Sequence, residues 1–422
     1  MTQSLVPAPQ SQPLLVGIDW ADQQHAVCTL AADGTAQLKT LSQDPDSIAE
    51  WVRSLKEQAP GPILIALEQS RGALVHALLE HQGLLLYPLN PKQLARFREA
   101  LYPSGGKSDP TDAELAARFL EHHRRQLRPY RPDSPETRKI ALLAETRRHL
   151  VEDRKCLVQR LTDALKQYFP LILKLFAKRL ASDLVLELLQ RWPSLPQLKR
   201  PHPKTLHAFF AQHRVRNAER QTEWINAIRS ATPLTQDPAL VEPYALLVQT
   251  LVRQIADLNA SIAQFEEQLS LAVAQHPDGS LFRSVPGAGD ALVPRLIAGF
   301  GSDRERYESA DAVATCTGIA PIIRQSGKTR LVTRRLACPK FLRQTFHELA
   351  DQTRKWSSWS KAYYTMKRAA GMAHHAAVRA LAFKWIRILF QLWKTRSTYS
   401  ETRYLEQLKK RNSPLLKYLE ST

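Results

Sequence analysis

The sequence predicts a mixed α/β domain followed by a mostly helical remainder, on three observations. Residues 14–130 alternate short apolar runs with helical patterns, residues 131–276 carry long helical repeats, and residues 321–422 are strongly basic. Short apolar runs bounded by turn residues are typical of buried strands, whereas spacings of three and four residues are typical of helices. The expected fold class is therefore α/β plus α, with the sheet in the amino-terminal part.

Residues 14–130 contain four expected strands and three expected helices. The strands are expected at residues 16–19, 26–30, 63–68 and 84–89, and the helices at residues 48–58, 73–82 and 111–120. The first two strands form a hairpin around Gln23 and Gln24. Strands that are followed by helices in this way indicate an α/β sheet domain.

Four acidic residues mark the polar ends of these elements. Asp19 follows the first apolar run, and Glu68 follows a later one. Pro110 suits the first turn of a helix, so Asp109 is expected at the N-cap and Asp112 as the third helical residue. Carboxylates without a neighbouring Cys or His favour Mg²⁺ or Mn²⁺ over Zn²⁺.

The order of these acids is the order found in RNase H-like nucleases. In that plan one acid lies on the first strand, one on a later strand and a pair opens a helix, and two cations flank a phosphodiester. Each acid alone has an ordinary interpretation as a helix cap or a solvated strand end. The hypothesis of a two-metal site therefore depends on the whole set.

Residues 131–276 are expected to form a helical, coiled-coil region. Leu143, Leu150 and Leu157 repeat at seven residues. A second seam has apolar residues at alternating spacings of four and three: Tyr244, Val248, Leu251, Ile255, Leu258, Ile262, Phe265 and Leu269. Heptad seams of this kind predict a coiled coil. The two seams pair either within the chain or with a second protomer, and a hairpin with an added dimer contact is favoured because connected helices pack locally.

A helical segment is inserted between these two seams, and its role stays open. It spans residues 171–243, with helices expected at residues 205–213 and 222–230.

Residues 277–395 are expected to form a further, mostly helical domain, followed by a basic tail at residues 396–422. The turn around Gly287 and Gly289 precedes a helix expected at residues 291–298. Amides exposed at such a turn suit a nucleic-acid phosphate. An ordinary turn with a positive-φ glycine explains the same residues.

Positive charge is concentrated at the carboxy-terminal end. The chain has 59 Lys and Arg against 40 Asp and Glu, and residues 321–422 hold 22 basic and 5 acidic residues, a local net charge of +17. Such a density favours binding of phosphate, because each neutralised phosphate releases counterions. Aromatic residues lie among these charges, and Trp356 and Trp359 are the expected stacking surfaces for unpaired bases of RNA or melted DNA.

Ser326 lies in an expected turn and is surrounded by cations. A serine hydroxyl accepts a phosphoryl group only if its proton is removed and the phosphate charge is offset. The sequence supplies cations but no neighbouring base, so a turn residue without chemistry is the alternative. The expected nucleic-acid contacts are Lys107, Gly287, Gly289, Arg324, Lys328, Arg330, Arg334 and Arg335.

Other features of the composition exclude several classes of protein. The four cysteines, at positions 28, 156, 316 and 338, lack metal-type spacing, as expected for a reduced cytoplasmic protein. Residues 1–13 are expected to be a flexible arm and not a signal peptide. No apolar stretch approaches the roughly 20 residues of a membrane span.

Several of these blocks, taken in order, resemble the DEDD transposases of bacterial insertion sequences, the bridge-RNA-guided recombinases. The blocks are Gly17-Ile18-Asp19, Glu68 with Ser70 and Gly72, Lys107-Ser108-Asp109 to Asp112-Ala113, Pro286-Gly287 to Gly289, and Gly318-Ile319-Ala320-Pro321 to Gln325-Ser326-Gly327-Lys328. The resemblance covers residues 14 to about 170 and 278 to about 395. It implies a RuvC-like domain with four catalytic acids and a transposase domain with a nucleophilic serine, which fall on Asp19, Glu68, Asp109, Asp112 and Ser326.

The resemblance also implies a mechanism and its partners. Ser326 attacks a scissile phosphate while Mg²⁺ is held by the acids, and strand exchange proceeds through a Holliday junction. A structured guide RNA pairs with target and donor DNA, a division of labour known from other RNA-guided enzymes. A dimer of dimers in the bacterial cytoplasm, at the nucleoid, is expected. The segment Trp20-Ala21-Asp22 and the long region 171–243 depart from the family pattern.

Two other functions remain open from the residues alone. A metal nuclease of the junction-resolving type uses water, and Ser326 is then structural. A non-catalytic nucleic-acid scaffold needs neither the acids nor the serine. The guide RNA, the target and donor sites, the tetramer geometry and the activity of this copy are beyond the sequence.

Overall fold

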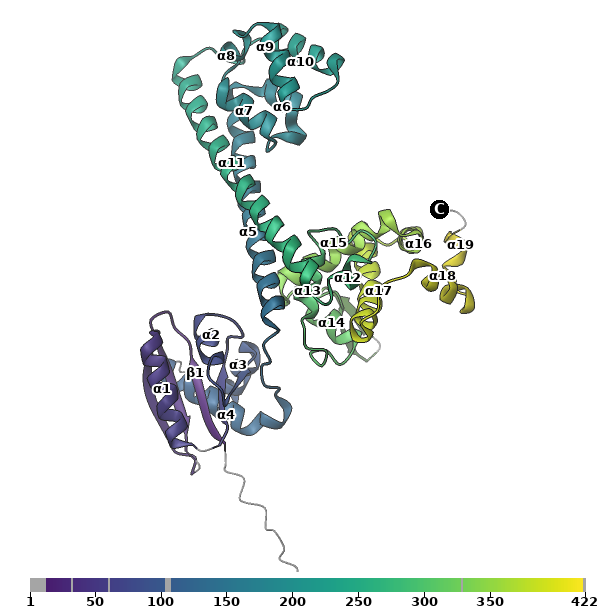
Figure 1. Ribbon diagram of the computed structural model, residues 1–422. Coiled ribbons are helices and arrows are strands. Elements are labelled where there is room, and N and C mark those ends of the chain that lie inside the picture. Colours follow the sequence, from purple (N-terminus) through teal and green to yellow (C-terminus); the bar gives the residue numbers. More distant parts are fainter. Residues whose placement is uncertain (1–12, 32, 60, 103–107, 328, 420–422) are drawn as a thin grey trace, which may run out of the picture. The chain divides into compact units, whose positions relative to one another are not determined.

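A computed structural model describes residues 13–31, 33–59, 61–102, 108–327 and 329–419. The chain divides into two compact units, Met1–Pro132 and Asp133–Thr422. The first unit contains a mixed sheet with flanking helices, and the second is almost entirely helical. The expected α/β plus α class is therefore confirmed (Figure 1).

The first unit is built on a five-stranded sheet. Its strands are β1 (Leu14–Asp19), β2 (Gln24–Leu30), β3 (Ala36–Ser42), β4 (Ile63–Leu67) and β5 (Leu84–Pro88), in the order β3-β2-β1-β4-β5. Strand β2 runs antiparallel to its neighbours β1 and β3, whereas β4 and β5 run parallel to β1. Sequence analysis missed β3, since this edge strand is mostly exposed, with Leu38 at 49%.

Helices cover both faces of this sheet. They are α1 (Pro45–Gln58), α2 (Ala73–Leu79), α3 (Pro91–Leu101), α4 (Asp109–His123) and the short 3₁₀ helix η1 (Arg124–Gln126). Side chains alternate between faces along a strand. Val16 and Ile18 accordingly pack with α1 and α2, whereas Leu64 and Ala66 pack with α3 and α4.

The start of α4 differs from the expectation. Ser108 is the N-cap, and its hydroxyl accepts a hydrogen bond from the amide of Thr111 at 3.4 Å. Asp109 is therefore the first helical residue and not the N-cap, because the Ser108 hydroxyl already accepts a hydrogen bond from the first turn of the helix. Asp109 and Asp112 nevertheless share that turn, where the helix dipole favours negative charge.

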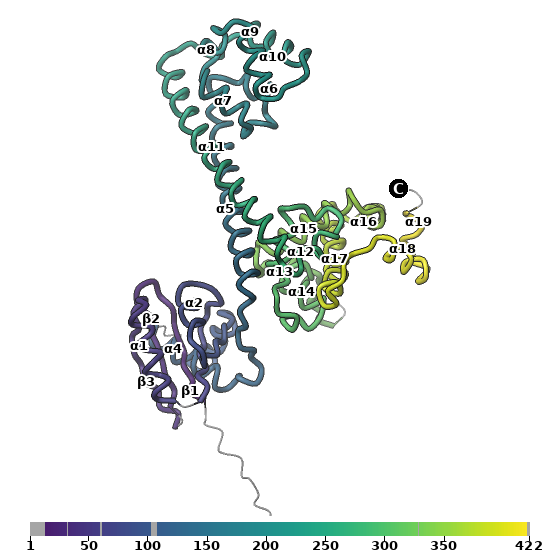
Figure 2. Tube along the Cα trace, viewed as in Figure 1, coloured from purple at the N-terminus to yellow at the C-terminus, as the bar shows by residue number. Residues whose placement is uncertain are grey.

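Two long helices connect the parts of the second unit. Helix α5 (Pro135–Tyr168) has 34 residues and α11 (Pro238–Gln275) has 38. They lie side by side (Figure 2) and run antiparallel within one chain. Three contacts fix the register, at 2.8, 3.0 and 2.9 Å: Thr137 with His276, Arg147 with Glu266, and Arg154 with Asn259. The supercoil of a coiled coil and an added dimer contact stay predictions.

The inserted segment forms a helical lobe with its own core. It comprises α6 (Pro170–Phe176), η2 (Ala177–Arg179), α7 (Asp183–Arg191), α8 (Leu195–Lys199), α9 (Pro203–Gln212) and α10 (Ala218–Ser230). Its buried residues pack with the adjoining ends of α5 and α11. The helices expected at residues 205–213 and 222–230 correspond to α9 and α10.

The carboxy-terminal part of the second unit has a core of large aromatic residues. Its elements are α12 (Gly279–Arg283), α13 (Val293–Phe300), α14 (Ala310–Cys316), β6 (Ile322–Ser326), β7 (Thr329–Thr333), α15 (Lys340–Trp356), α16 (Ser358–Ala369), α17 (His374–Thr395), α18 (Glu401–Lys410) and α19 (Leu416–Leu419). Trp359, Trp385 and Trp393 are fully buried in this core. The expected stacking role of Trp359 is therefore wrong, since its indole lies in the core and donates to the Tyr399 hydroxyl at 2.7 Å. The division into domains at residues 276 and 395 stays a prediction.

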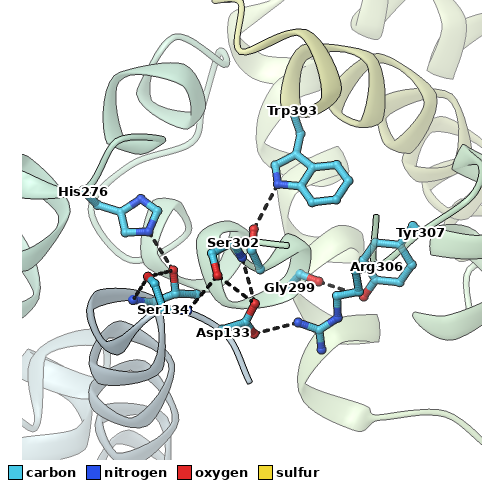
Figure 3. A network of polar contacts seen from close by, with 10 residues as sticks. Asp133, Ser134, His276, Gly299, Ser302, Arg306, Tyr307 and Trp393 are labelled. Carbon is cyan, nitrogen blue, oxygen red and sulfur yellow. Dashed lines mark hydrogen bonds and ion pairs between the residues drawn. The ribbon is translucent and has the colours of Figure 1, made fainter. Parts of the chain in front are cut away.

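A polar network anchors the start of α5 to the segment after α13 (Figure 3). Asp133 accepts hydrogen bonds from the amide of Ser302 at 2.8 Å and from Arg306 at 2.8 Å. The Trp393 indole donates to the carbonyl of Gly301 at 3.0 Å. Because these groups satisfy one another's hydrogen bonds, they fix the position of the chain at the start of α5.

Candidate active site

The two strand acids lie at one edge of the sheet. Ile18 pairs with Leu67 in the parallel ladder of β1 and β4, and the next residue of each strand is an acid, Asp19 and Glu68. Parallel strands end on the same side, so the register brings the two positions together. Asp19 is half-buried and Glu68 is exposed, which leaves the edge open to a ligand.

Gly17 brings α4 against this edge. A side chain at Gly17 would overlap the carbonyl oxygen of Ala113 and lie 2.5 Å from the amide nitrogen of Ala117. Only a glycine therefore allows the helix to pack this close to β1. Asp19 lies two residues after Gly17, on the same face of the sheet, and Asp112 directly precedes Ala113.

The carboxylate of Asp112 is buried and paired. It is 5% exposed, and Arg98 on α3 donates to its Oδ1 at 2.5 Å. Asp109, one turn earlier, is exposed. Sequence analysis missed Arg98, because the two partners lie on different helices and no spacing in the sequence connects them. The described residues therefore bring Asp19, Glu68 and Asp112 to one region by register and packing, with an arginine that neutralises one acid.

The chemistry of these donors fits a hard divalent cation. The four acids of the predicted site, Asp19, Glu68, Asp109 and Asp112, offer only carboxylate oxygens. Mg²⁺ and Mn²⁺ prefer such ligands to the sulfur of Cys or the nitrogen of His. Within the part of the chain that the structure describes, no three His, Cys, Asp or Glu side chains already form a compact metal-binding group.

Ser326 is the last residue of β6 and not a residue of the turn. It pairs with Thr329 of β7, so the hairpin closes over two residues, of which Gly327 has a φ of 53°. Residues directly opposite in an antiparallel pair share a face. Arg324 is two residues before Ser326 on the same strand, so the two side chains share a face. Arg330 is opposite Gln325 and lies on the other face. Of these two arginines, only Arg324 therefore lies on the side of the Ser326 hydroxyl, whereas the sequence led us to expect both around it. Ser326 is exposed, and no base was expected beside it.

The glycine turn before α13 has a packing role. Gly287 has a φ of 76°, and a side chain there would lie 3.1 Å from the backbone of Gln352 and from the ring of Trp356. The exposed carboxylate of Asp290 follows, 3.7 Å from Arg283. Positive φ and close packing explain Gly287 without a ligand, and phosphate binding at Gly287 and Gly289 stays a prediction.

The remaining expected nucleic-acid contacts are only partly described. Lys107 and Lys328 lie outside the described residues. Arg334 is exposed and Arg335 is half-buried, both in the segment that follows β7.

A mixed sheet with acids at one edge, in a chain that also has a strongly basic helical unit, agrees with the class of nucleic-acid enzymes expected from the sequence, to which transposases belong. A model of DEDD transposases of the IS110 type matches residues 16–170, and a model of the IS116/IS110/IS902 transposase family matches residues 279–365. The chain belongs to this family of insertion-sequence transposases. The resemblance inferred from the sequence blocks is thereby confirmed at the level of the family.

Curated relatives match almost the whole chain. A protein of Streptomyces coelicolor described as a transposase for the IS117 mini-circle is 27% identical over 93% of this chain and 97% of its own length. An uncharacterized 42 kDa protein of insertion element IS900 from Mycobacterium paratuberculosis is 25% identical over 92% and 98%. An uncharacterized 44.8 kDa protein of IS116 from Streptomyces clavuligerus is 26% identical over 91% and 96%. No helix within the described ranges is long and apolar enough to span a bilayer.

Proposed function

We propose that this transposase cuts and rejoins DNA with a RuvC-like domain of RNase H fold and a separate serine nucleophile. The strand order β3-β2-β1-β4-β5, antiparallel in its first three strands and parallel in the rest, supports an RNase H-like fold. The observation that carries the proposal is the convergence of Asp19 and Glu68 at one sheet edge, with α4 drawn against that edge at Gly17.

The four acids would hold the metal. Asp19, Glu68, Asp109 and Asp112 supply the carboxylates, and a bound Mg²⁺ would supply positive charge against the scissile phosphate. Arg98 donates a hydrogen bond to the Asp112 carboxylate and would orient it before the cation binds. A divalent cation is the expected cofactor, with Mg²⁺ proposed ahead of Mn²⁺.

The serine would carry out the transfer. The Ser326 hydroxyl gives its proton to water, and its oxygen forms a new ester bond to phosphorus as the bond from phosphorus to a deoxyribose oxygen breaks. The leaving oxygen takes up a proton from water, so the step releases no net proton. Arg324, on the same face of the hairpin, would offset the charge of the phosphate. Reversal of this step with a different strand end rejoins the DNA and allows exchange through a Holliday junction.

We further propose the partners that the family resemblance implied. These are target and donor DNA, a structured guide RNA and other copies of the chain in a dimer of dimers, in which the acids of one protomer act with the serine of another. The net charge of +17 in residues 321–422 supports binding of nucleic acid, because phosphates would release counterions there. Action in the bacterial cytoplasm, at the nucleoid, follows from a DNA substrate.

Trapping of a covalent intermediate tests the serine. Ser326→Ala should bind DNA as the parent does, yet give no protein–DNA adduct on denaturing gels with Mg²⁺ present. Thr329→Ala, which removes the hydroxyl directly across the hairpin, is the matched control and should retain the adduct. If Ser326→Ala nicks DNA at the parent rate and leaves free ends, the serine mechanism is rejected and hydrolysis by water at the acids takes its place.

Substitution of the acids tests the metal site separately. Asp19→Asn, Glu68→Gln and Asp109→Asn should each abolish strand transfer without loss of folding, since each removes charge and little volume. Asp112→Asn should also abolish strand transfer, but it removes the carboxylate that pairs with Arg98, so its melting temperature should fall. Asp22→Asn, next to the site in sequence, is the control and should stay active. Near-parent recombination by two of the four variants would refute the assignment. Equal cleavage with and without divalent metal would favour the scaffold interpretation, in which a contaminating nuclease cuts the DNA.

A further inference from the structure

Two packed helices of the second unit present matched basic pairs to each other. Arg343 and His347 are four residues apart on α15, and His375 and Arg379 are four residues apart on α17, so each pair shares one helix face. The rings of His347 and His375 lie with their centroids 5.6 Å apart. The two helices pack against each other, and Arg343 lies within electrostatic range of Arg379.

A third arginine joins this group from the segment after β7. Arg334 directly follows the last residue of β7, and the same segment contains Cys338, whose sulfur accepts a hydrogen bond from Arg343 at 3.5 Å. Gly318 lies against Cys338 so closely that a side chain at position 318 would overlap the sulfur. This packing holds the segment against the start of α15 and brings Arg334 within electrostatic range of Arg379.

The charges in this group are not balanced. Among the described residues, no carboxylate forms an ion pair with Arg334, Arg343 or Arg379. Other arginines of the same helices are paired: Arg354 with Asp351 at 2.6 Å, and Arg387 with Asp311 at 3.3 Å. Burial, and then the charges of Arg334 and Arg343, lower the pKa of Arg379. Arg343 and Arg379 are half-buried and Arg334 is exposed, and three guanidinium groups that repel one another in this way are stabilised by a bound anion.

We propose that Arg334, Arg343 and Arg379 bind one phosphodiester group of a polynucleotide backbone. His375, exposed beside them, adds a further donor. A guanidinium group can donate two parallel hydrogen bonds to phosphate oxygens. Three such groups, held by three different segments, can approach one tetrahedral phosphate from several directions, which arginines on a flat surface cannot do. The site rests on the proposed function and deepens it, because Arg334 directly follows β7, the strand that completes the Ser326 hairpin, and lies eight residues after Ser326. A strand held here would have its backbone fixed at a set distance from the serine.

Nucleic-acid binding by full-length protein tests the site. Affinity is measured against salt concentration for single-stranded DNA, duplex DNA and single-stranded RNA, with a chelator present so that no cleavage occurs. Arg379→Gln should weaken binding about tenfold and lower the salt slope by about 0.9 for duplex or about 0.7 for single strands, the value for one phosphate. Arg343→Gln combined with Arg379→Gln should lower the slope no further, since both contact the same phosphate.

Arg216→Gln provides the matched control. Arg216 is an exposed arginine of the helical lobe, before α10, and its substitution removes the same charge. It should leave affinity and slope as in the parent. Because Arg379→Gln relieves repulsion, its melting temperature without nucleic acid should equal or exceed that of the parent. Arg379→Lys, which retains the charge but not the fork, should bind with intermediate affinity and gives a second measure if the glutamine variant folds poorly.

The outcomes separate the sources of the phosphate and the two proposals. A loss confined to DNA, or confined to RNA, supports the site and identifies the strand. Parent-like affinity and slope of the Arg379→Gln and double variants for all three probes would overturn it. A loss of affinity equal to that of Arg216→Gln would also overturn it, because net charge alone would then explain the effect. None of these results depends on Ser326 or on the acids, so failure here leaves the proposed chemistry untouched.

Discussion

The Arg98 guanidinium on α3 lies 2.5 Å from the Asp112 carboxylate at the entrance of α4, and the two side chains are only 19% and 7% exposed. This ion pair links helix α3 to Asp112, an acid of the candidate site. An arginine in this position neutralises a carboxylate that a cation would also attract. Folding and metal binding are therefore expected to respond to Arg98 in opposite directions.

Arg98→Gln should destabilise the protein without metal and strengthen its response to metal. Loss of Arg98 removes a charged partner from the buried Asp112 carboxylate, at a cost of about 3 kcal/mol. Removal of a positive charge beside the acids should lower the Mg²⁺ concentration that gives half of the thermal stabilisation. Arg96→Gln, an exposed arginine of the same helix, is the control for melting curves across a metal titration. Equal metal dependence of the parent and Arg98→Gln would show that Asp112 does not contact the cation.

Trp356 should provide a stacking surface for an unpaired base. Its side chain is 72% exposed at the end of α15, whereas the other expected ring, Trp359, is buried. Trp356→Ala should weaken binding of single strands by about 1–3 kcal/mol, the usual contribution of one stacked base. Trp356→Phe retains a ring and should lose less. Equal affinity of the alanine variant and the parent in fluorescence anisotropy would exclude stacking at this position.

Gly301→Ala should destabilise the second unit through contact with the polar network. Gly301 has a φ of 76°, and a side chain there would lie 2.5 Å from both Asp133 and Arg306. Gly371 has a φ of 81° with open space around it, so Gly371→Ala carries backbone strain alone. The difference between the two variants in chemical denaturation should be about 1–3 kcal/mol. Equal losses would mean that the network moves aside at no cost.

The stability of the second unit should fall as the solution is acidified below about pH 7. Burial lowers the pKa of His276 from its ordinary value of 6.5. Its Nδ1 accepts from the amide of Asp278 at 3.1 Å, which a protonated ring could not do. The unfolded chain takes up the proton first, so stability is lost between pH 6.5 and the lower folded pKa, by at most about 1.4 kcal/mol per pH unit.

His276→Gln should flatten this slope. The slope should not vanish, because burial also lowers the pKa of His347. His149→Gln, an exposed histidine of α5, should leave the slope as in the parent. Denaturation midpoints at several pH values give the comparison, and an unchanged slope in His276→Gln would assign the effect to other groups.

Local patterns predicted much of the fold, because strands and helices with buried faces have periodic sequences. The apolar runs ending at Asp19 and Glu68 became β1 and β4, and the heptad seams became α5 and α11. The edge strand β3 was missed because nearly all of its side chains are exposed, so its sequence lacks the alternation of apolar and polar residues that marks a half-buried strand. The cap of α4 was misplaced by one residue, since serine and aspartate cap equally well.

Contacts between distant segments account for what the sequence could not predict. Arg98 meets Asp112 only because α3 packs beside α4, and Arg379 meets Arg334 only because α17 packs near the segment after β7. Trp359 and Trp356 are three residues apart in the same basic stretch, and only packing decides which of them is buried. Composition located the basic region, whereas the grouping of its charges needed the tertiary structure.

The antiparallel pair of helices α5 and α11 sets the distance between the two hydrophobic cores of the second unit. Ile140 belongs to one hydrophobic core and Leu161 to the next, and at about 1.5 Å per helical residue the two levels of α5 are roughly 30 Å apart. A single inserted residue in α5 would turn everything beyond it by about 100° and detach the contacts of Arg147 and Arg154 from α11. Removal of seven residues from both helices would instead keep the facing surfaces matched. The spacing between the two cores is therefore expected to change most readily when α5 and α11 gain or lose the same number of whole turns.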